Sequence, residues 1–318
     1  MVIARRFGLV SALVLVLGTA ACDSERHGRE AEGAGEQAGE ASDGKKSITI
    51  KGSDTMVILA QRWAEAYMKA NPGVSVQVSG GGSGTGIAAL INGTTDIANA
   101  SRAMKDREKK QVQDRQGAAP KEVPVALDAL AVYVHEDNSV ESLTFQQLQR
   151  IYRAKVDNWK DVGGPDRDIT LYGRENNSGT YVYFKENVLD NMDFASDTQT
   201  LPGTSAVINA VGKDTGGIGY GGIGYAEGVR TVPVAPEGGD PVEPTKENAT
   251  GGEYPLARSL YMYTPGEPKG RIADFIEFVR SPEGQDVVEG AGYYPLPSEG
   301  SGGADGTADE DDDGASDG

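Results

Sequence analysis

Cysteine and histidine are almost absent from this chain of 318 residues, which contains one cysteine, Cys22, and two histidines, His27 and His135. A single cysteine excludes a disulfide within the chain, a thiolate metal cluster and a cysteine nucleophile in the folded region. A histidine zinc site or a Ser-His-Asp triad would depend on His135, for which the sequence offers no partner. This scarcity argues against the commoner hydrolytic and metal-dependent enzymes.

Basic residues are outnumbered, with 30 lysines and arginines against 48 aspartates and glutamates and a formal net charge of −18. Residues 299–318 contain eight acids and no base. A chain this acidic is a poor partner for nucleic acid, because binding requires basic side chains that neutralise phosphates. Its overall field cannot attract an anion either, so an anion site would have to rely on local dipoles and placed cations.

Long apolar runs are also missing, and the one near the N-terminus, from Leu9 to Leu17, is too short to span a membrane. It follows Arg5-Arg6 and ends in Gly18-Thr19-Ala20-Ala21-Cys22, which resembles the lipobox of bacterial lipoproteins. Residues 1–22 are therefore predicted to be a lipoprotein signal peptide, with Cys22 as the lipidated first residue of the exported protein. A plain signal peptide with an incidental cysteine is the alternative.

Composition divides the rest of the chain into a folded body and two polar ends. Residues 23–46 are rich in Gly, Ala and Glu and are predicted to be a disordered tether, and residues 299–318 a disordered acidic tail. Between them, alternating strand and helix patterns predict an α/β fold with mostly parallel sheets. The length makes two domains the expectation.

A glycine-rich turn, residues 79–86, joins a predicted strand at 74–78 to a short apolar helix. Two further turns of the same kind, at 52–55 and 177–180, also lead into predicted helices. The first amide groups of a helix have no intrahelical acceptor, and the helix dipole favours negative charge there. We expect the three turns to converge on one small oxyanion, with the glycines giving backbone access to it.

Two arginines accompany these turns. Arg174 is followed by Ser178-Gly179-Thr180, and Arg102 follows Ser101 at the end of a buried-type strand, where ligands sit in open α/β sheets. A guanidinium gives bidentate, charge-assisted hydrogen bonds to an oxyanion, and the hydroxyls add further donors. A surface or interdomain salt bridge is the alternative for each arginine.

Motifs of catalysis are incomplete. Thr85 stands where the last glycine of a Gly-x-Ser-x-Gly elbow belongs, and no Gly-Lys-Ser/Thr completes a phosphate loop. A serine nucleophile would need a base, and none is evident. Hydroxyl donors and two cations without a base are expected to bind a ligand rather than transform it, so we predict a binding protein without enzymatic activity or cofactor.

Five motifs in order resemble those of the phosphate-binding lipoproteins of the bacterial high-affinity phosphate ABC importer, and the resemblance covers residues 48–297. They are Gly52-Ser53-Asp54-Thr55-Met56, the glycine turn at 79–86, Asp96-Ile97-Ala98-Asn99-Ala100-Ser101-Arg102, Arg174-x-x-x-Ser178-Gly179-Thr180 and Ser281-Pro282-Glu283-Gly284-Gln285. The resemblance implies a two-lobed periplasmic-binding-protein fold of type II, with two mixed sheets flanked by helices and a ligand cleft between the lobes. Lobe 1 would comprise residues 47–127 and 254–298, and lobe 2 residues 128–253.

The same resemblance implies a substrate-binding subunit that captures inorganic phosphate by cleft closure and delivers it to a membrane permease. The implied partners are the permease and ATPase subunits of the importer and, through lipidated Cys22, the lipid bilayer. The protein would be a monomer in the cell envelope, anchored at the periplasmic face of the inner membrane or at the outer surface of the plasma membrane. By position, the residues that match the family's phosphate contacts are Asp54, Thr55, Ser83, Ser101, Arg102, Arg174, Ser178, Gly179 and Thr180.

One position departs from the family pattern, because the best-known members have an acidic residue where this chain has Arg102. Asp54 is then the candidate acceptor for the proton of phosphate, and a helix N-cap is its alternative role. Sulfate has no proton at neutral pH, so a buried carboxylate would reject it. Sulfate, molybdate or another tetrahedral oxyanion is the alternative ligand, and a cell-surface phosphoester hydrolase or signalling protein is the alternative of another class.

Overall fold

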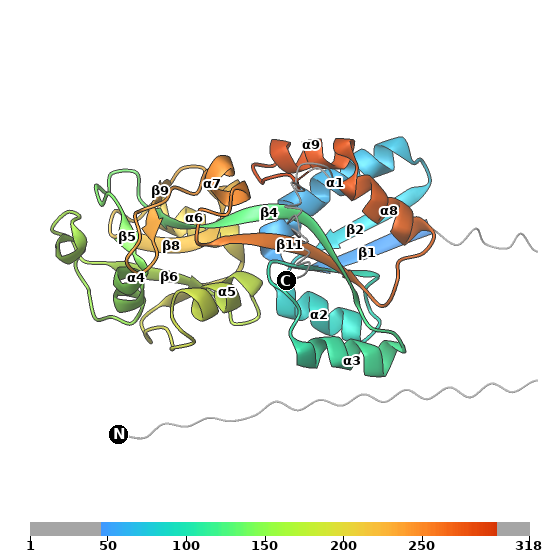
Figure 1. Cartoon of the computed structure of the whole chain (residues 1–318), viewed down its shortest axis with the longest axis horizontal. Coiled ribbons are helices and arrows are strands. Elements are labelled where there is room, and N and C mark those ends of the chain that lie inside the picture. Colours follow the sequence, from blue (N-terminus) through green and yellow to red (C-terminus); the bar gives the residue numbers. More distant parts are fainter. Residues whose placement is uncertain (1–45, 298–318) are drawn as a thin grey trace, which may run out of the picture. The chain divides into compact units, whose positions relative to one another are not determined.

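The computed structural model describes residues 46–297. The predicted signal peptide with Cys22 and the acidic tail lie outside these residues, as does the tether apart from Lys46, which begins the first strand. None of the helices in residues 46–297 combines the length and the apolar character that a membrane span requires. Strands and helices alternate along the described chain, as the sequence predicts (Figure 1).

The first group of elements, here called the first lobe, is built on a mixed sheet. Strand β1 (Lys46–Gly52) lies between β2 (Val74–Ser79) and β3 (Ile97–Ala100) and is parallel to both. Strand β11 (Ala257–Thr264) is antiparallel to β3 and to the first part of β4 (Lys121–Val134). The helical segments of this lobe are η1 (Asp54–Met56), α1 (Val57–Ala70), α2 (Ser83–Ile91), α3 (Asp106–Gln116), α8 (Arg271–Arg280) and α9 (Pro282–Gly290).

The second lobe is built on the last part of β4, which pairs antiparallel with β8 (Gly217–Gly222) and β9 (Arg230–Val232). Strand β6 (Thr170–Arg174) is parallel to β8 and to β7 (Gln199–Leu201), and β5 (Leu143–Thr144) pairs with β10 (Val234–Ala235). Its helical segments are α4 (Phe145–Tyr152), η2 (Trp159–Val162), α5 (Gly179–Asn187), α6 (Gly203–Val211), η3 (Ile223–Tyr225) and α7 (Lys246–Thr250). The predicted α/β fold with mixed sheets flanked by helices is confirmed. Strand β4 joins the strands of the two lobes into one nine-stranded sheet, and β5 and β10 form a separate two-stranded sheet.

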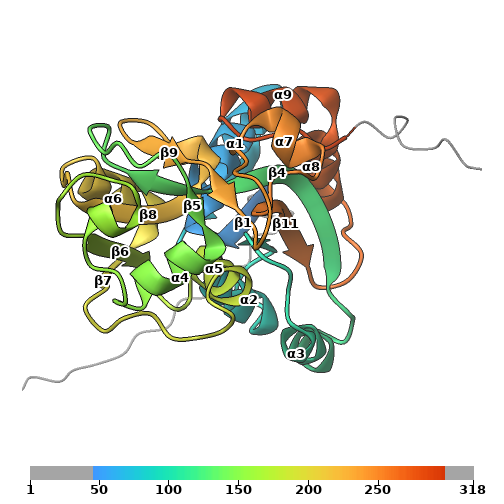
Figure 2. The same ribbon diagram turned by 60° about the vertical axis from the view of Figure 1, so that its left-hand side comes forward.

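Two neighbouring strands connect the lobes. Figures 1 and 2 show β4 and β11 running side by side from one group of elements to the other. Asp128 of β4 lies opposite Arg258 of β11 in this pairing. The remainder of β4 is buried and almost wholly apolar from Ala129 to Val134, as expected for a strand covered on both faces.

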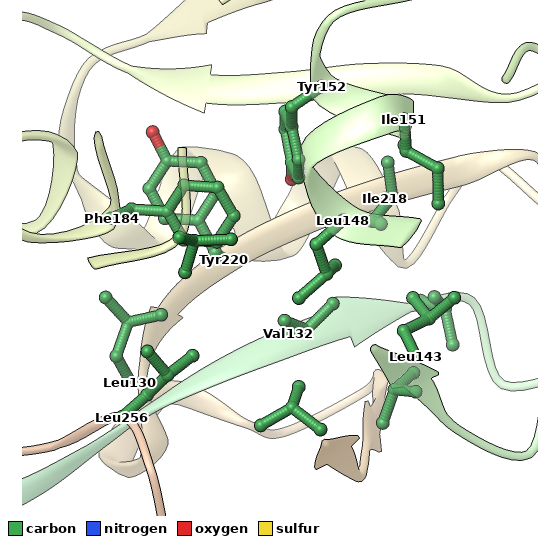
Figure 3. Packing of buried hydrophobic residues seen from close by; sticks show 14 of the residues in the cluster. Leu130, Val132, Leu143, Leu148, Ile151, Tyr152, Phe184, Ile218, Tyr220 and Leu256 are labelled. Carbon is green, nitrogen blue, oxygen red and sulfur yellow. The ribbon is translucent and has the colours of Figure 1, made fainter. Parts of the chain in front are cut away.

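Each lobe has its own apolar core. In the first, the buried Trp63 of α1 donates its indole N–H to the carbonyl of Gly284 at 2.7 Å and so ties α1 to α9. In the second, the rings of Phe184 on α5 and Tyr220 on β8 are stacked with their centroids 4.1 Å apart (Figure 3). This stack fixes α5 against the sheet, and the first turn of α5 carries predicted site residues.

Two helices begin with side-chain caps. Thr144 Oγ1 accepts from the amide of Gln147, and Gln147 Oε1 accepts from the amide of Thr144, which forms the capping box of α4. Ser281 Oγ accepts from the amide of Gly284, with Pro282 at the first position of α9. By contrast, α2 begins at Ser83, four residues earlier than the apolar pattern from Ile87 indicates, because the glycine turn itself enters the helix.

Candidate functional site

Four hydroxyl side chains from both lobes meet at one place. Thr55 Oγ1 lies 2.8 Å from Thr180 Oγ1, and Ser101 Oγ lies 3.5 Å from Thr180 Oγ1 and 3.4 Å from Ser83 Oγ. All four residues are buried. Thr55, Ser83 and Ser101 come from η1, α2 and the end of β3, and Thr180 comes from α5. The three turns expected to converge do converge, and we call these four side chains the hydroxyl cluster.

Gly179 allows this approach of the lobes. A Cβ atom at Gly179 would lie 2.3 Å from Ser83 Oγ, 2.9 Å from Ser83 Cβ and 2.8 Å from Ser101 Oγ. Figures 1 and 2 show α5 next to α2, which is the contact that this glycine permits. The neighbouring Ser178 is the N-cap of α5, and its Oγ accepts from the amide of Tyr181 at 3.3 Å. The Ser178 hydroxyl hydrogen is thereby left to serve as a donor.

Arg174 and Asp54 form an ion pair across the lobes. Arg174 ends β6 and is buried, and its Nη2 donates to Asp54 Oδ2 at 2.8 Å, while Nη1 donates to Thr204 Oγ1 at 2.9 Å. Burial lowers the pKa of Arg174, and the carboxylate of Asp54 acts to raise it, but the pKa stays below its ordinary value. A guanidinium nevertheless remains charged at neutral pH.

The Asp54 carboxylate does not cap a helix. Its Oδ1 accepts from the amide of Gly81 at 2.8 Å, and η1 has no hydrogen bond to a capping side chain. The backbone around it is fixed by two tyrosine hydroxyls, because Tyr225 donates to the Asp54 carbonyl and Tyr293 to the Thr55 carbonyl. These two hydrogen bonds therefore fix the backbone of both site residues of η1, Asp54 and Thr55.

Arg102 is placed differently from the other predicted site residues. Its Nη1 and Nη2 each donate to Glu108 at 2.8 Å, and Nη1 also donates to the carbonyl of Ala103. Burial acts to raise the pKa of Glu108, but hydrogen bonds from Arg102 and from the Lys105 amide outweigh it and hold that pKa below the usual range. The salt bridge considered as an alternative thus occupies both Nη atoms, and the buried Arg102 Nε has no hydrogen-bond partner among residues 46–297.

The glycines of the 79–86 turn make room for protein atoms rather than for an anion. A Cβ at Gly80 would lie 2.4 Å from Asp54 Oδ1, and one at Gly86 would lie 2.3 Å from the carbonyl oxygen of Lys51. The amide of Gly84, expected to face the anion, instead donates to the carbonyl of Asn177 at 2.9 Å. The prediction that these glycines give a ligand access to the backbone is therefore wrong for Gly80, Gly84 and Gly86. Protein atoms fill the space beside Gly80 and Gly86, and the amide of Gly84 already has a protein acceptor.

Sequence reasoning missed a further buried cation, Arg258. Its Nε donates to Asp128 Oδ2 at 2.9 Å, and its Nη2 donates to Thr180 Oγ1 of the hydroxyl cluster at 3.0 Å. Arg258 shares the buried face of β11 with Leu260 and Met262, and Asp128 interrupts an almost wholly apolar strand. The sequence does contain a signal for this pair, because each of the two residues stands among apolar residues of a strand. Charged residues are seldom buried unless they are paired.

The chemistry of the arrangement is that of a binding site. Arg174 donates to the hydroxyl of Thr204 and Arg258 to that of Thr180, and each of these two guanidinium groups is paired with one carboxylate. In residues 46–297 no group of three or more His, Cys, Asp or Glu side chains is arranged to hold a metal ion. The donor set suits a small oxyanion, to which charged donors give short and strong hydrogen bonds.

Comparison with known proteins shows which families this chain resembles. Residues 35–283 match the family described as the PBP superfamily domain. The phosphate-binding protein PstS of Pseudomonas aeruginosa is 40% identical over 270 residues, which cover 79% of this chain and 84% of that protein. PstS of Bacillus subtilis is 30% identical over 292 residues, which cover 91% of this chain and 92% of that protein.

Solved structures show the same relationship. A phosphate ABC transporter substrate-binding protein from Clostridium perfringens, with bound phosphate, has a TM-score of 0.71 and 32% identity and covers 79% of this chain and 100% of its own. An ABC-type phosphate transport receptor from Vibrio cholerae has a TM-score of 0.64 and 29% identity, with the same coverage of both chains. From the motifs, the fold and these relatives together, the chain belongs to the PBP superfamily and, within it, to the PstS family of phosphate-binding proteins.

Proposed function

We propose that this protein is the substrate-binding subunit of an ABC importer, which captures inorganic phosphate between its lobes and delivers it to a membrane permease. The observation that carries the proposal is the hydroxyl cluster, to which both lobes contribute beside the buried Arg174. The PstS relatives and the phosphate-bound structure from Clostridium perfringens support this ligand. A ligand held by both lobes stabilises the closed arrangement over an open one, as capture by closure requires.

The proposed phosphate contacts come from each of the predicted turns. Hydroxyl groups of the cluster and of Ser178, together with the first amides of α5 at Gly179 and Thr180, donate to the phosphate oxygens. Arg174 supplies positive charge, and Arg102 contributes through Nε while Glu108 holds its two Nη atoms. The proposed set is Asp54, Thr55, Ser83, Ser101, Arg102, Arg174, Ser178, Gly179 and Thr180.

Selectivity is assigned to Asp54. Each carboxylate oxygen has two lone pairs, so a carboxylate that already accepts from Arg174 and Gly81 can also accept the proton of phosphate. Sulfate offers no proton, and its oxygens would face the carboxylate as unpaired negative charge. The same contact therefore favours phosphate and disfavours sulfate.

Closure and anchoring complete the proposal. The moving bodies are residues 47–127 with 254–298 and residues 128–253, and the Lys105–Glu186 ion pair of 2.9 Å is one contact that closing forms between them. The protein acts as a monomer without enzymatic activity, tethered to the lipid bilayer of the cell envelope through Cys22. Its further partners are the permease and ATPase subunits of the importer.

Titration calorimetry of the chain from Asp23 to Gly318 with phosphate, sulfate and molybdate tests the function. Phosphate is expected to bind with the highest affinity and sulfate far more weakly. Tighter binding of sulfate or molybdate would show that the site serves another oxyanion. Release of phosphate from a chromogenic ester, abolished by Ser83→Ala, would show instead that the protein is a hydrolase.

A further inference from the structure

The pair formed by Arg258 and Asp128 lies where β4 and β11 pass between the lobes. Both residues are buried, with 6% of Arg258 and none of Asp128 exposed. Arg258 Nη2 lies 2.8 Å from Asp128 Oδ2, and Nε donates to the same oxygen. Asp128 Oδ1 accepts from the amide of Ile223, so both carboxylate oxygens have partners.

A purely structural role accounts poorly for this pair. Burying two charges seldom stabilises a fold more than a well-packed apolar pair does, because both charges lose their hydration. A pair kept for structure would also satisfy its donors, yet the buried Nη1 of Arg258 has no hydrogen-bond partner within the described part of the chain. An unsatisfied donor on a buried charged group carries a large desolvation cost.

The position of the unsatisfied donor points to the oxyanion site. Arg258 Nη2 donates to Thr180 Oγ1, which lies 2.8 Å from Thr55 Oγ1. Nη1 belongs to the same guanidinium and is therefore close to the hydroxyl cluster. The charge of Arg258 also acts on Arg174, where it adds to the effect of burial in lowering the pKa of Arg174. The guanidinium groups of Arg258 and Arg174 are thus close enough for their charges to interact.

We propose that Arg258 is a third cation of the phosphate site, besides Arg174 and Arg102: Asp128 holds the guanidinium, Nη2 orients the Thr180 hydroxyl, and Nη1 donates to the bound anion. The inference rests on the proposed function and adds a residue that the sequence motifs do not contain. With Arg258 included, the site has three ion pairs, Arg174 with Asp54, Arg102 with Glu108 and Arg258 with Asp128, each neutral overall. Removal of Arg258 would leave the Asp128 carboxylate uncompensated beside the ligand.

Phosphate itself supplies a way to detect this charge, because it changes from a monoanion to a dianion near neutral pH. An uncompensated carboxylate repels the dianion more than the monoanion, so affinity lost with Arg258 should grow with pH. Arg258 also lines a groove together with Arg102, Tyr183 and Tyr261. The titratable groups that interact with Arg258 or line this groove contain no histidine, the side chain that ordinarily changes charge between pH 5 and 8. They are Arg102, Lys105, Asp106, Asp128, Tyr133, Arg174, Tyr183, Glu186, Tyr261 and Tyr293.

The test is calorimetry of phosphate binding at pH 6 and pH 8 with the chain from Asp23 to Gly318. Arg258→Gln is expected to weaken binding about 10-fold at pH 6 and about 100-fold at pH 8, the range for loss of a hydrogen bond to a charged group. Arg230→Gln is the matched control, because it makes the same charge change at a residue that donates to the carbonyls of Asn138 and Val140. This control should bind phosphate as the wild type does at both pH values.

Asp128→Asn gives a prediction of opposite sign and keeps the shape of the side chain. With the carboxylate neutralised and Arg258 retained, the ratio of affinity at pH 8 to affinity at pH 6 should rise above that of the wild type. A structural role would weaken binding equally at the two pH values in either variant, and that result, or wild-type affinity in Arg258→Gln, overturns the inference. Failure of the wild type to bind phosphate would overturn the proposed function instead, so the two failures are distinguishable.

Discussion

Substitution of Gly179 by alanine should hinder closure of the two lobes while leaving the folding of each lobe unaffected. The added methyl group would lie 2.3 Å from Ser83 Oγ and 2.8 Å from Ser101 Oγ, and rotation of these hydroxyls cannot relieve the 2.9 Å approach to Ser83 Cβ. These atoms belong to the first lobe, whereas Gly179 belongs to the second. An open protein should therefore accommodate the methyl group, while the closed one must move its lobes apart.

The size of the effect follows from this overlap. Overpacking of a well-packed contact costs about 1–3 kcal/mol. Since each 1.4 kcal/mol is a factor of ten in an equilibrium constant, the closed form should lose about 5- to 150-fold in population. Because phosphate is held by both lobes, apparent affinity should fall by a similar factor, since it scales with the population of the competent form. The free energy of unfolding without phosphate should change little.

Calorimetry measures the affinity, and urea unfolding without phosphate measures the stability. Gly290→Ala is the matched control, because Gly290 is also helical and nothing lies within 4 Å of its would-be Cβ. The control should bind phosphate normally and gain up to about 1 kcal/mol of stability from the less flexible unfolded chain. Wild-type affinity in Gly179→Ala would refute the argument, as would a loss of unfolding free energy equal to the loss of binding energy.

Three further variants test other contacts. Asp54→Asn should weaken phosphate binding and narrow the affinity gap between phosphate and sulfate; competition calorimetry that finds the gap unchanged would remove Asp54 as the acceptor. Ser281→Ala should cost about 1 kcal/mol in urea unfolding, because it removes the N-cap of α9, with phosphate affinity of the folded protein unchanged. Glu108→Gln should destabilise the protein at neutral pH. Folding lowers the pKa of Glu108 below its ordinary value of 4.5, so the ionised carboxylate stabilises the folded state above pH 4.5. This stabilisation is lost as the pH falls through the pKa that Glu108 has in the folded state. Unfolding curves of variant and wild type should therefore converge in acid, and a constant difference would contradict this assignment.

Local signals sufficed to predict much of the fold and the core of the site. The glycine turns and strand ends that place Thr55, Ser83, Ser101 and Thr180 are short-range patterns, and the hydroxyl cluster does assemble from them. The caps of α4 and α9 are likewise formed by residues three apart in the sequence. Such features depend on a few neighbouring residues, so the sequence contains most of what determines them.

Long side chains and distant pairings were harder to predict. Helix α3 has one buried apolar residue, Val112, and shows no amphipathic period, so its Glu108 was not recognised as the partner of Arg102. The Asp128–Arg258 pair joins residues 130 positions apart in the sequence, and β11 had not been identified as a strand. Where an arginine directs its guanidinium depends on these tertiary neighbours and not on the motif that contains it.

The bonds between the turn at 79–86 and Asn177 have a consequence for measurements on this protein. The amide of Gly84 donates to the Asn177 carbonyl, and Asn177 Nδ2 donates to the carbonyl of Gly81, so two hydrogen bonds between protein groups join these segments. The lobes can then adopt the closed arrangement without a bound anion, and the anion shifts the equilibrium between the open and closed arrangements. A fluorescent dye attached near the contact between the lobes would report whether they are closed, not whether phosphate is bound. A phosphate sensor of this kind would therefore give some signal without phosphate. Weakening the Asn177 contacts should reduce that signal.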